Sequence, residues 1–315
     1  MNTAPLFSIV IPSLNRGELL DRCLASICAQ DFTDVEIIVV DAGSTDSTPD
    51  VLSRYAPRVQ AIVEQGIGVS DGRNAGVKYA SGRFIVFVDS DDLLMESALR
   101  LYASLVEGQN GLPLILAAFQ PFSDEGELRA LAERRPNLEI RRFDTYLDAA
   151  AAGHLSGTHR LIIERSTYLE AGGLDSRLRV CEDQDFGLRV NQCPCLLVIT
   201  PATIAYRQHA GNISAGAASF GFGAQWLVRA ERRGAYPGGG ERQALRRTVI
   251  SRTARSASLA CLDQGHVSQA FALYRDTFTW HVAQARMKYL VGFPIKALFG
   301  LLTGGMSATT QTSRS

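Results

Sequence analysis

The sequence lacks several patterns that mark common protein classes. Its six cysteines include no CxxC pair and no accompanying histidine cluster, which argues against a zinc site. Their spacing does not suggest a disulfide scaffold, so we expect a reducing compartment, and we interpret Cys193 and Cys195 as buried thiols rather than a redox pair. No basic segment precedes the first apolar run, so we predict no signal peptide.

The chain also lacks net charge, with 32 basic and 32 acidic residues among 315. The balance is uneven, because residues 1–225 hold 19 Lys/Arg and 28 Asp/Glu, whereas residues 226–315 hold 13 and 4. We therefore predict an acidic, cation-binding domain over residues 1–225 and a basic, mostly helical C-terminal extension over residues 226–315. We expect no nucleic-acid partner.

Apolar runs and helical patterns alternate through the first ninety residues. The pattern predicts strands at 7–12, 35–40, 59–64 and from 84, helices at 18–29, 48–55 and 75–80, and a glycine-rich loop at 66–74. This alternation predicts an α/β fold, Rossmann-like, with a mostly parallel sheet flanked by helices. Later segments are less regular; they suggest strands at 114–119 and 158–164 and helices at 125–135, 165–171 and from 182.

The fourth predicted strand runs directly into three carboxylates, Asp89, Asp91 and Asp92. Acids this close repel one another, and a bound Mg²⁺ or Mn²⁺ would relieve the repulsion. The alternative is an N-cap for a helix over residues 93–105. Two further predicted strands end in polar loops at Asn15 and Asp41, and parallel strands bring such ends to one edge, which favours a nucleotide site.

Several motifs in series resemble the inverting GT-A glycosyltransferases of family two, over about residues 6–215. They are Val10 to Asn15, Val39 to Asp46, Gly66 to Gly76, Asp89 to Asp92, Gly172 to Asp175, Glu182-Asp183 with Arg189, and Arg207-Gln208-His209 with Asn212 and Ser214. Gly72 and Ala42 depart slightly from the family's usual residues. The resemblance implies a GT-A fold and transfer of a sugar from a nucleoside diphosphate donor.

The resemblance also implies roles for individual residues. Asp41 would face the base, Asp183 would be the catalytic base, and His209 would complete the metal shell or contact the diphosphate. Asp91 is the expected direct ligand of Mn²⁺ or Mg²⁺, with Asp89 reaching the ribose or the ion. The remaining donor-binding candidates are Pro12, Ser13, Asn15, Ser44, Arg73 and Asn74. Further site candidates are Glu182, Arg189 and Arg207, the last facing either a phosphate or solvent; Asp92 is left outside the metal site as a helix cap.

Two other functions remain open from the sequence. A sugar nucleotidyltransferase resembles this fold but uses a glycine-rich basic loop after the first strand, which residues 12–17 match poorly. A non-catalytic nucleotide-sugar or glycan binding protein would be expected to have a disrupted acid set. The acceptor that we expect is a hydroxyl of a glycan or of a lipid-linked acceptor, as in the synthesis of cell-surface polysaccharide or glycoconjugates.

The C-terminal extension combines arginines with an apolar segment. Eight arginines between 229 and 255, Arg246 among them, are opposed only by Glu231 and Glu241. Residues 286–302 are apolar but shorter than the ~20 residues of a membrane span. We expect a cytoplasmic protein whose segment 286–302 lies on an anionic leaflet at the inner face of the membrane. The alternatives are packing on the catalytic domain or a dimer contact; residues 303–315 are predicted to be disordered.

Overall fold

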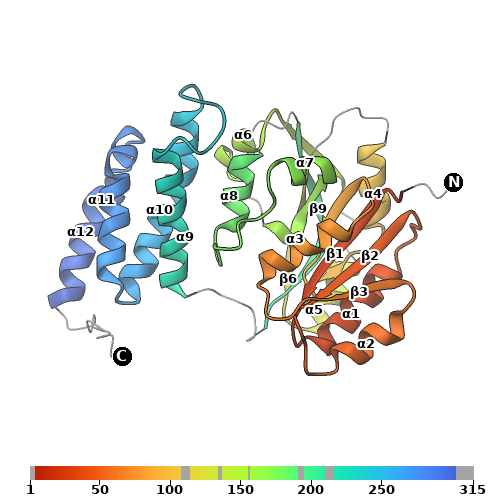
Figure 1. Cartoon of the computed structure of the whole chain (residues 1–315). Helices are drawn as coiled ribbons and strands as arrows, with labels where there is room; N and C mark the ends of the chain where they lie inside the picture. The colour runs from red at the N-terminus through yellow and green to blue at the C-terminus, as the bar shows by residue number, and fades with distance from the viewer. Residues whose placement is uncertain are drawn as a thin grey trace. The chain divides into compact units, whose positions relative to one another are not determined.

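The structure is a computed structural model that describes residues 4–107, 114–133, 137–154, 157–190, 195–209 and 216–302. The chain divides into two units, which we describe separately: Met1–Arg177 with Arg189–Asn212, and Leu178–Leu188 with Ile213–Ser315. The first unit is built around a sheet and the second from helices (Figure 1). The predicted Cys193, Asn212, Ser214 and residues 303–315 lie outside the described residues.

Strand and helix alternate in the first half of unit 1, as predicted. The elements are β1 (Phe7–Ser13), α1 (Gly17–Cys28), β2 (Val35–Asp41), α2 (Thr48–Tyr55), β3 (Val59–Val63), α3 (Val69–Tyr79) and β4 (Phe84–Phe87). These strands lie in the order β3-β2-β1-β4, and all three pairings are parallel. The carboxyl ends of β1, β2 and β4 therefore meet at one edge of the sheet.

The second half of unit 1 continues the sheet in mixed orientation. It contains β5 (Leu93–Leu94), α4 (Ala98–Val106), β6 (Leu114–Phe122), α5 (Glu125–Glu133), β7 (Glu139–Phe143), α6 (Tyr146–Ala151), a 3₁₀ turn (Thr158–Arg160), β8 (Leu161–Glu164), α7 (Arg165–Glu170) and β9 (Leu196–Arg207). Within the described residues, nine strands form one sheet ordered β3-β2-β1-β4-β8-β6-β9-β5, with β7 paired to β9. β8 is antiparallel to both β4 and β6, whereas β6 and β9 are parallel.

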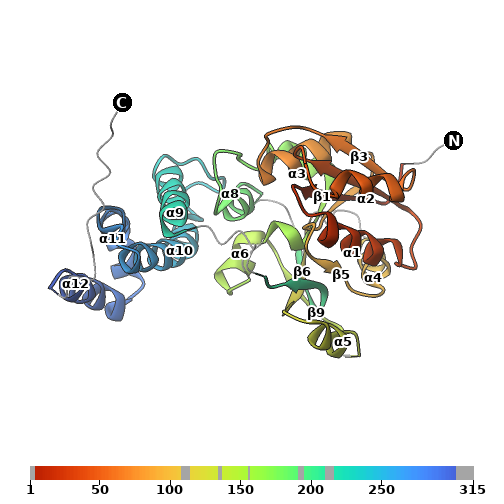
Figure 2. The ribbon, with the colours of Figure 1, turned by 90° about the horizontal axis from the view of Figure 1, so that it is seen from below.

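Helices cover both faces of the parallel strands. Apolar side chains of α1, α2 and α4 join alternate residues of β1, β2 and β4 in the main core. Figure 2 shows α1 and α4 on one side of the strands and α3 on the other. On the α3 side the contact is close, since a Cβ on Gly76 would lie 2.3 Å from a methyl carbon of Val10. Glycine at position 76 thus lets α3 approach β1.

Two local predictions were wrong. The glycine-rich segment is helical from Val69, six residues earlier than predicted, because α3 packs on β1 and β2. The segment after Asp92 does not begin a helix: Leu93 and Leu94 pair with Ala205 and Ile204 of β9, and α4 starts only at Ala98. A tertiary strand pairing therefore overrides the local helical pattern.

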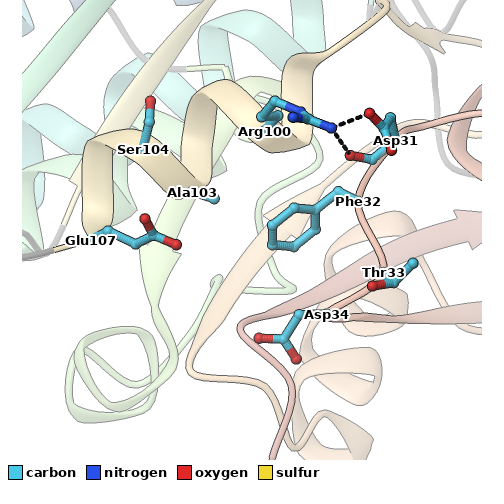
Figure 3. A pocket seen from close by; sticks show the side chains of 8 residues that line it. All are labelled: Asp31, Phe32, Thr33, Asp34, Arg100, Ala103, Ser104 and Glu107. Carbon is cyan, nitrogen blue, oxygen red and sulfur yellow. Dashed lines mark hydrogen bonds and ion pairs between the residues drawn. The ribbon is translucent and has the colours of Figure 1, made fainter.

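A pocket lies between the α1–β2 loop and α4, near the amino end of β2. Arg100 donates to the side chain of Asp31 and, at 3.2 Å, to its carbonyl oxygen (Figure 3). The lining residues are Asp31, Phe32, Thr33, Asp34, Arg100, Ala103, Ser104 and Glu107. Ligands of open α/β sheets bind at the opposite edge, outside the carboxyl ends of the strands, so we do not assign the active site here.

Unit 2 contains most of α8 (Glu182–Arg189) together with α9 (Ala217–Arg232), α10 (Gln243–Asp263), α11 (Val267–Ala283) and α12 (Met287–Leu302). Asp185 attaches α8 to its neighbours, since its Oδ1 accepts hydrogen bonds from Tyr236 Oη at 2.9 Å and Trp226 Nε1 at 3.3 Å. The division into domains 1–225 and 226–315 stays a prediction. Among the described residues, none of the helices has the length and hydropathy needed to span a membrane.

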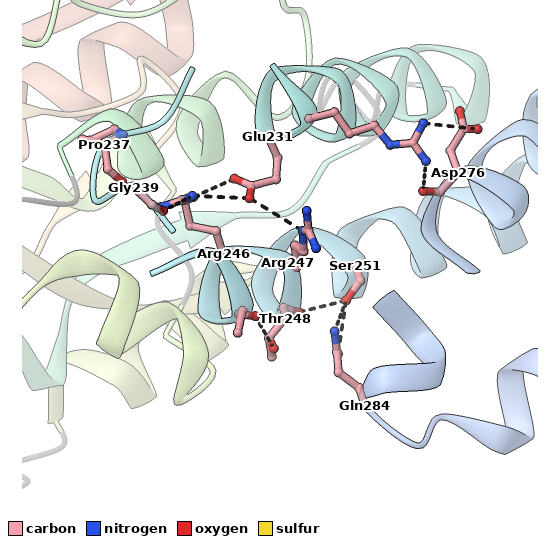
Figure 4. Close-up of polar contacts among 11 residues, drawn as sticks. Glu231, Pro237, Gly239, Arg246, Arg247, Thr248, Ser251, Asp276 and Gln284 are labelled. Carbon is pink, nitrogen blue, oxygen red and sulfur yellow. Dashed lines mark hydrogen bonds and ion pairs between the residues drawn. The ribbon is translucent and has the colours of Figure 1, made fainter. Parts of the chain in front are cut away.

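A buried ion pair joins α9 and α10. Arg246 and Glu231 are each 2% exposed, and Arg246 Nε donates to Glu231 Oε2 at 2.6 Å (Figure 4). The remaining guanidinium nitrogens donate to the carbonyl oxygens of Pro237 and Gly239 at 2.9 and 2.8 Å. The charge of Arg246, one of the eight clustered arginines, is therefore neutralised inside unit 2 by Glu231, one of the two acids that oppose them.

We predict that Glu231→Ala destabilises unit 2 by about 3–5 kcal/mol, because it leaves the Arg246 charge buried and uncompensated. Both tryptophans of the chain, Trp226 and Trp280, lie in unit 2, so urea unfolding followed by tryptophan fluorescence measures this change. The control is Arg275→Ala, which removes an exposed pair with Asp276 and should cost less than about 1 kcal/mol. Equal unfolding midpoints for the two variants would contradict the prediction.

Candidate active site

Three carboxylates gather where β4 ends. One side-chain oxygen from each of Asp89, Asp91 and Asp92 lies within 4.8 Å of the others. A tight turn produces this geometry, since the Asp92 amide donates to the Asp89 carbonyl oxygen at 3.0 Å. Asp92 is fully buried; its Oδ1 accepts the Arg207 amide at 3.0 Å, and its Oδ2 has no hydrogen-bond partner within the described part of the chain. Asp92 therefore faces the cluster and does not cap a helix.

The three acids differ in their electrostatic environment. Burial, together with the negative charges of Asp89 and Asp91, raises the pKa of Asp92 to about 8, and the Arg207 amide opposes the shift. Burial acts to raise the pKa of Asp89, but the charge and hydrogen bond of Arg73, with His159 and Arg16, together outweigh it and the net direction is downward. The pKa values of these two neighbouring carboxyl groups are therefore shifted in opposite directions.

Asp91 and His209, the two predicted metal ligands, are in contact. Asp91 Oδ2 lies 3.0 Å from His209 Nε2, and the two side chains come from the β4–β5 turn and the residues after β9. Arg16, which the sequence analysis did not select, lies against both: its Nη1 is 3.3 Å from Asp91 Oδ2 and 3.0 Å from His209 Nε2. A cation in the β1–α1 loop at the same edge as three acids was the signal that could have identified it.

Asp41 lies at the end of β2 beside Ser13, its partner in the β1–β2 register. Asp41 Oδ1 accepts from the Ser44 amide at 3.1 Å and from Ser44 Oγ at 2.5 Å, and Ser44 Oγ in turn accepts the Asn15 amide at 2.7 Å. The predicted donor residues Asn15, Asp41 and Ser44 thus form one hydrogen-bonded network between two strand ends.

A mostly apolar pocket opens beside this network. Its lining residues are Asp41, Gly43, Ser44, Thr45, Pro49, Leu52, Ser53, Ala56, Val59, Ala61, Val63 and Gln65. Asp41 provides a carboxylate at its end, and Val63 is 62% exposed on the edge strand β3. The pocket combines apolar walls with a carboxylate, an arrangement that is common in small-molecule sites.

Pro12 and Ser13 end β1 next to the cluster. Pro12 pairs with Val40, and a Cβ on Gly72 would lie 3.2 Å from the Pro12 Cβ, so α3 passes close to this strand end. Ser13 is buried, and its Oγ has no hydrogen-bond partner among the described residues. An unsatisfied hydroxyl in a buried position is energetically costly.

Arg73 and Asn74 lie on α3 but differ in their surroundings. Arg73 is buried and donates to the Asp89 carboxylate, which places it in the acid cluster. Asn74 instead holds the turn after α7: its Oδ1 accepts from Tyr168 Oη at 2.6 Å and from the Leu174 amide at 2.9 Å, and its Nδ2 donates to the Leu174 carbonyl oxygen at 2.9 Å. In this structure the Asn74 amide therefore has a positioning role.

Arg207 is 8% exposed, so the solvent-facing alternative was wrong. Its Nε donates to the Asp91 carbonyl oxygen at 3.2 Å, and its guanidinium lies 4.6 Å from the centre of the Phe122 ring. Arg189 donates to the carbonyl oxygen of Ala171. Arg207 thus supports the turn that carries the acids.

Glu182 and Asp183 open α8 in unit 2, as predicted for the start of a helix. Asp183 is half-buried, and its Oδ1 accepts the Gln184 amide at 2.7 Å. Gln184 is itself held by Thr253, whose Oγ1 donates to Gln184 Oε1 at 2.6 Å. The helix is thus anchored to α10 through Gln184. The roles of Glu182 and Asp183 in the reaction stay predictions.

An aromatic cluster that the sequence analysis did not find lies in unit 1. The His159 ring is 5.5 Å from Phe119 and 5.6 Å from Tyr206, measured between ring centres. Burial lowers the pKa of His159, while the negative charge of Asp89 opposes that shift. The three rings come from distant parts of the sequence, so no local pattern could have indicated the cluster.

Comparison with known proteins identifies the family. Residues 8–166, just over half of the chain, match the family described as glycosyl transferase family 2. A PGL/p-HBAD biosynthesis glycosyltransferase of Mycobacterium bovis is 42% identical over 98 residues, which are 30% of this chain and 38% of that protein. The match thus spans less than two thirds of that relative's length.

Two solved structures share the fold. TarS of S. aureus in complex with UDP-GlcNAc has a TM-score of 0.56 and 17% identity over 91% of this chain and 92% of its own. The mannosyltransferase PcManGT of Pyrobaculum calidifontis in complex with GDP-Man and Mn²⁺ has a TM-score of 0.51 and 19% identity over 94% and 88%. These likenesses confirm the predicted GT-A fold class. From the extent of the sequence match, the chain belongs to glycosyl transferase family 2.

Proposed function

We propose that the protein is a metal-dependent, inverting glycosyltransferase that moves a sugar from a nucleoside diphosphate donor to a hydroxyl of a glycan or lipid-linked acceptor. The observation that carries the proposal is the acid cluster of unit 1, in which Asp92 presents a buried, unpaired Oδ2 beside Asp89 and Asp91. Unpaired buried carboxylate oxygens are costly, and a shared cation offsets that cost.

The residues present fit Mn²⁺ or Mg²⁺. Carboxylate oxygens are the ligands that these hard ions prefer, and the cluster supplies them from Asp89, Asp91 and Asp92, with His209 adjacent. When bound, the ion would supply Lewis acidity that stabilises the charge of the departing diphosphate. The burial and the neighbouring negative charges that raise the pKa of Asp92 are the conditions that a bound cation would relieve.

The nucleotide would lie across the ends of β1 and β2. The base occupies the pocket beside Asp41, with Ser44 and Asn15 holding that carboxylate in place. The unpaired Ser13 hydroxyl and Arg73, which is beside Asp89, lie where the ribose and diphosphate would follow. TarS was solved with UDP-GlcNAc and PcManGT with GDP-Man, so the two similar structures hold different bases. The proposal therefore covers both uracil and guanine.

Asp183 would act as the general base that takes the proton from the acceptor hydroxyl during attack on the sugar. Glu182 and Arg189, at the two ends of the same helix, would position it. A single direct displacement inverts the anomeric configuration, in agreement with the resemblance on which the sequence-based prediction rests.

A lipid-linked acceptor would lie at a membrane, and we propose that α12 contacts an anionic membrane surface. Its residues Met287, Val291, Ile295 and Leu298 are 49–60% exposed and recur at helical spacing, while Lys288 and Lys296 are also exposed. An apolar stripe with flanking lysines is typical of helices that lie in the interface of an anionic leaflet. The protein would then work at the inner face of the cytoplasmic membrane.

We predict that Asp91→Ala lowers Mn²⁺-dependent transfer at least about a hundredfold, because the charge of the leaving diphosphate loses its stabilisation. A thermal-shift panel of nucleoside diphosphate sugars with Mn²⁺ first identifies the donor, and release of the nucleoside diphosphate then measures turnover. Asp31→Ala, at the opposite edge of the sheet, is the control and should leave turnover unchanged. Turnover that needs no metal and is unaffected by Asp91→Ala would contradict the proposal; pyrophosphate release from a nucleoside triphosphate would favour the nucleotidyltransferase alternative.

A second substitution tests the base. Asp183→Asn should lower sugar transfer about 10²–10⁴-fold, while the thermal shift produced by donor and Mn²⁺ stays the same. Glu241→Gln, an exposed acid of unit 2, serves as the control. Intact transfer in Asp183→Asn alongside loss in Asp91→Ala would show that the base is another residue and that the metal site is correct.

A third test concerns α12. The double substitution Val291→Asp with Ile295→Asp should weaken co-sedimentation with phosphatidylglycerol vesicles at least about tenfold, because two exposed apolar side chains are removed and two negative charges are added. Leu138→Asp, an equally exposed leucine of unit 1, is the control. Unchanged vesicle binding would contradict membrane contact, and a loss of dimers measured by light scattering would instead indicate a dimer contact.

A further inference from the structure

Arg16 occupies an unusual place for a loop arginine. Its Nη1 lies within 3.3 Å of Asp91 Oδ2 and 3.0 Å of His209 Nε2, and the three side chains are 18–23% exposed. Both side chains belong to the group that the proposed function assigns to a divalent cation. A positive group of the chain itself therefore lies where two candidate metal ligands converge.

The two side chains lie close enough together to hold one cation. Asp91 Oδ2 and His209 Nε2 are 3.0 Å apart. Arg16 Nη1 and Asp91 Oδ2 each lie 3.0 Å from His209 Nε2, so this nitrogen either accepts from Arg16 or donates to Asp91, according to the tautomer of the ring.

The backbone around Arg16 is held in place by hydrogen bonds to the residues before and at the start of α2. The amide of Arg16 donates to Thr48 Oγ1 at 3.2 Å, and the amide of Gly17 donates to Asp46 Oδ2 at 3.0 Å. Asn15 has a φ of 52°, in the left-handed region, and its Oδ1 accepts the Thr45 amide at 2.8 Å. A guanidinium that moves would therefore swing about a fixed Cα at the edge of the sheet.

We infer that Arg16 is an internal counter-ion that a divalent cation displaces from Asp91 and His209, and that the displaced guanidinium then binds the diphosphate of the donor. The inference rests on the proposed function. Two cations cannot share the same oxygen and nitrogen lone pairs at these distances, so metal entry and the Arg16 contact exclude one another. A guanidinium binds phosphate oxygens in a bidentate manner, and the diphosphate would lie at the same strand ends.

Metal affinity measured without nucleotide tests this inference directly. Free Mn²⁺ is followed by electron paramagnetic resonance for the full-length wild-type chain, Arg16→Ala and Arg16→Gln. Both variants should bind Mn²⁺ about fivefold more tightly, because the competing internal cation has been removed. Arg83→Ala, which removes an arginine paired with Glu164 near the start of β4, is the control and should match the wild type.

The nucleotide side of the inference is measured with UDP and GDP in saturating Mn²⁺. Arg16→Ala and Arg16→Gln should bind the diphosphate about tenfold more weakly, since they lack the guanidinium. Arg16→Lys should keep Mn²⁺ affinity near the wild-type value, because the competing charge remains, but should still weaken diphosphate binding. Thermal unfolding midpoints identify any variant that has failed to fold. If Arg16→Ala fails to fold, Arg16→Gln, which retains a long polar side chain, still tests the inference.

The outcomes separate this inference from the proposed function. Unchanged or weaker Mn²⁺ binding in folded Arg16→Ala and Arg16→Gln would overturn the displacement, even if the wild type is a metal-dependent transferase. Tighter Mn²⁺ binding with unchanged diphosphate affinity would overturn the second half of the inference alone. A wild-type chain that binds no Mn²⁺ would overturn the metal site and the displacement together.

Discussion

Three carboxylates repel one another at the end of one buried strand, and several elements of unit 1 supply the groups that compensate this repulsion. Each acid is held by a different part of the fold. Asp89 has Arg73 from α3, Asp92 has the backbone of β9 at Arg207, and Asp91 has Arg16 from the β1–α1 loop. Segments that are distant in sequence are therefore brought together by the need to compensate the same local charge. The charged edge is at once the candidate site and a junction between the two halves of the sheet.

The parts of the fold that the sequence predicted correctly are those that local physics determines. Long apolar runs define β1, β2 and β4, and Pro49 in the first turn agrees with a helix that begins at Thr48. The errors occur where tertiary contacts decide the structure. Leu93 and Leu94 read as the start of a helix but pair with β9, and the early start of α3 depends on packing against β1.

In the candidate site, too, some residues could be predicted from the sequence, whereas others depend on tertiary contacts. Asp41, Asp89 and Asp91 could be selected because acids at strand ends are visible in the sequence, and their proximity follows from parallel topology. The orientation of Asp92 could not, since it depends on the Arg207 amide 115 positions away. The partners of Asn74 and the aromatic neighbours of His159 are equally remote in sequence. The contacts of these two side chains could therefore be found only in the structure.

Asn74 has a consequence for how this chain can vary. Its amide group makes three hydrogen bonds, to Tyr168 and to both backbone groups of Leu174, across 94 to 100 residues of sequence. Gly173, with a φ of 67°, leaves room for the contact, because a Cβ there would lie 2.5 Å from Asn74 Oδ1. One amide thus sets where the chain returns to the helix beside β1. The loops that join the elements from β6 to β8 can therefore change in length without shifting that return point.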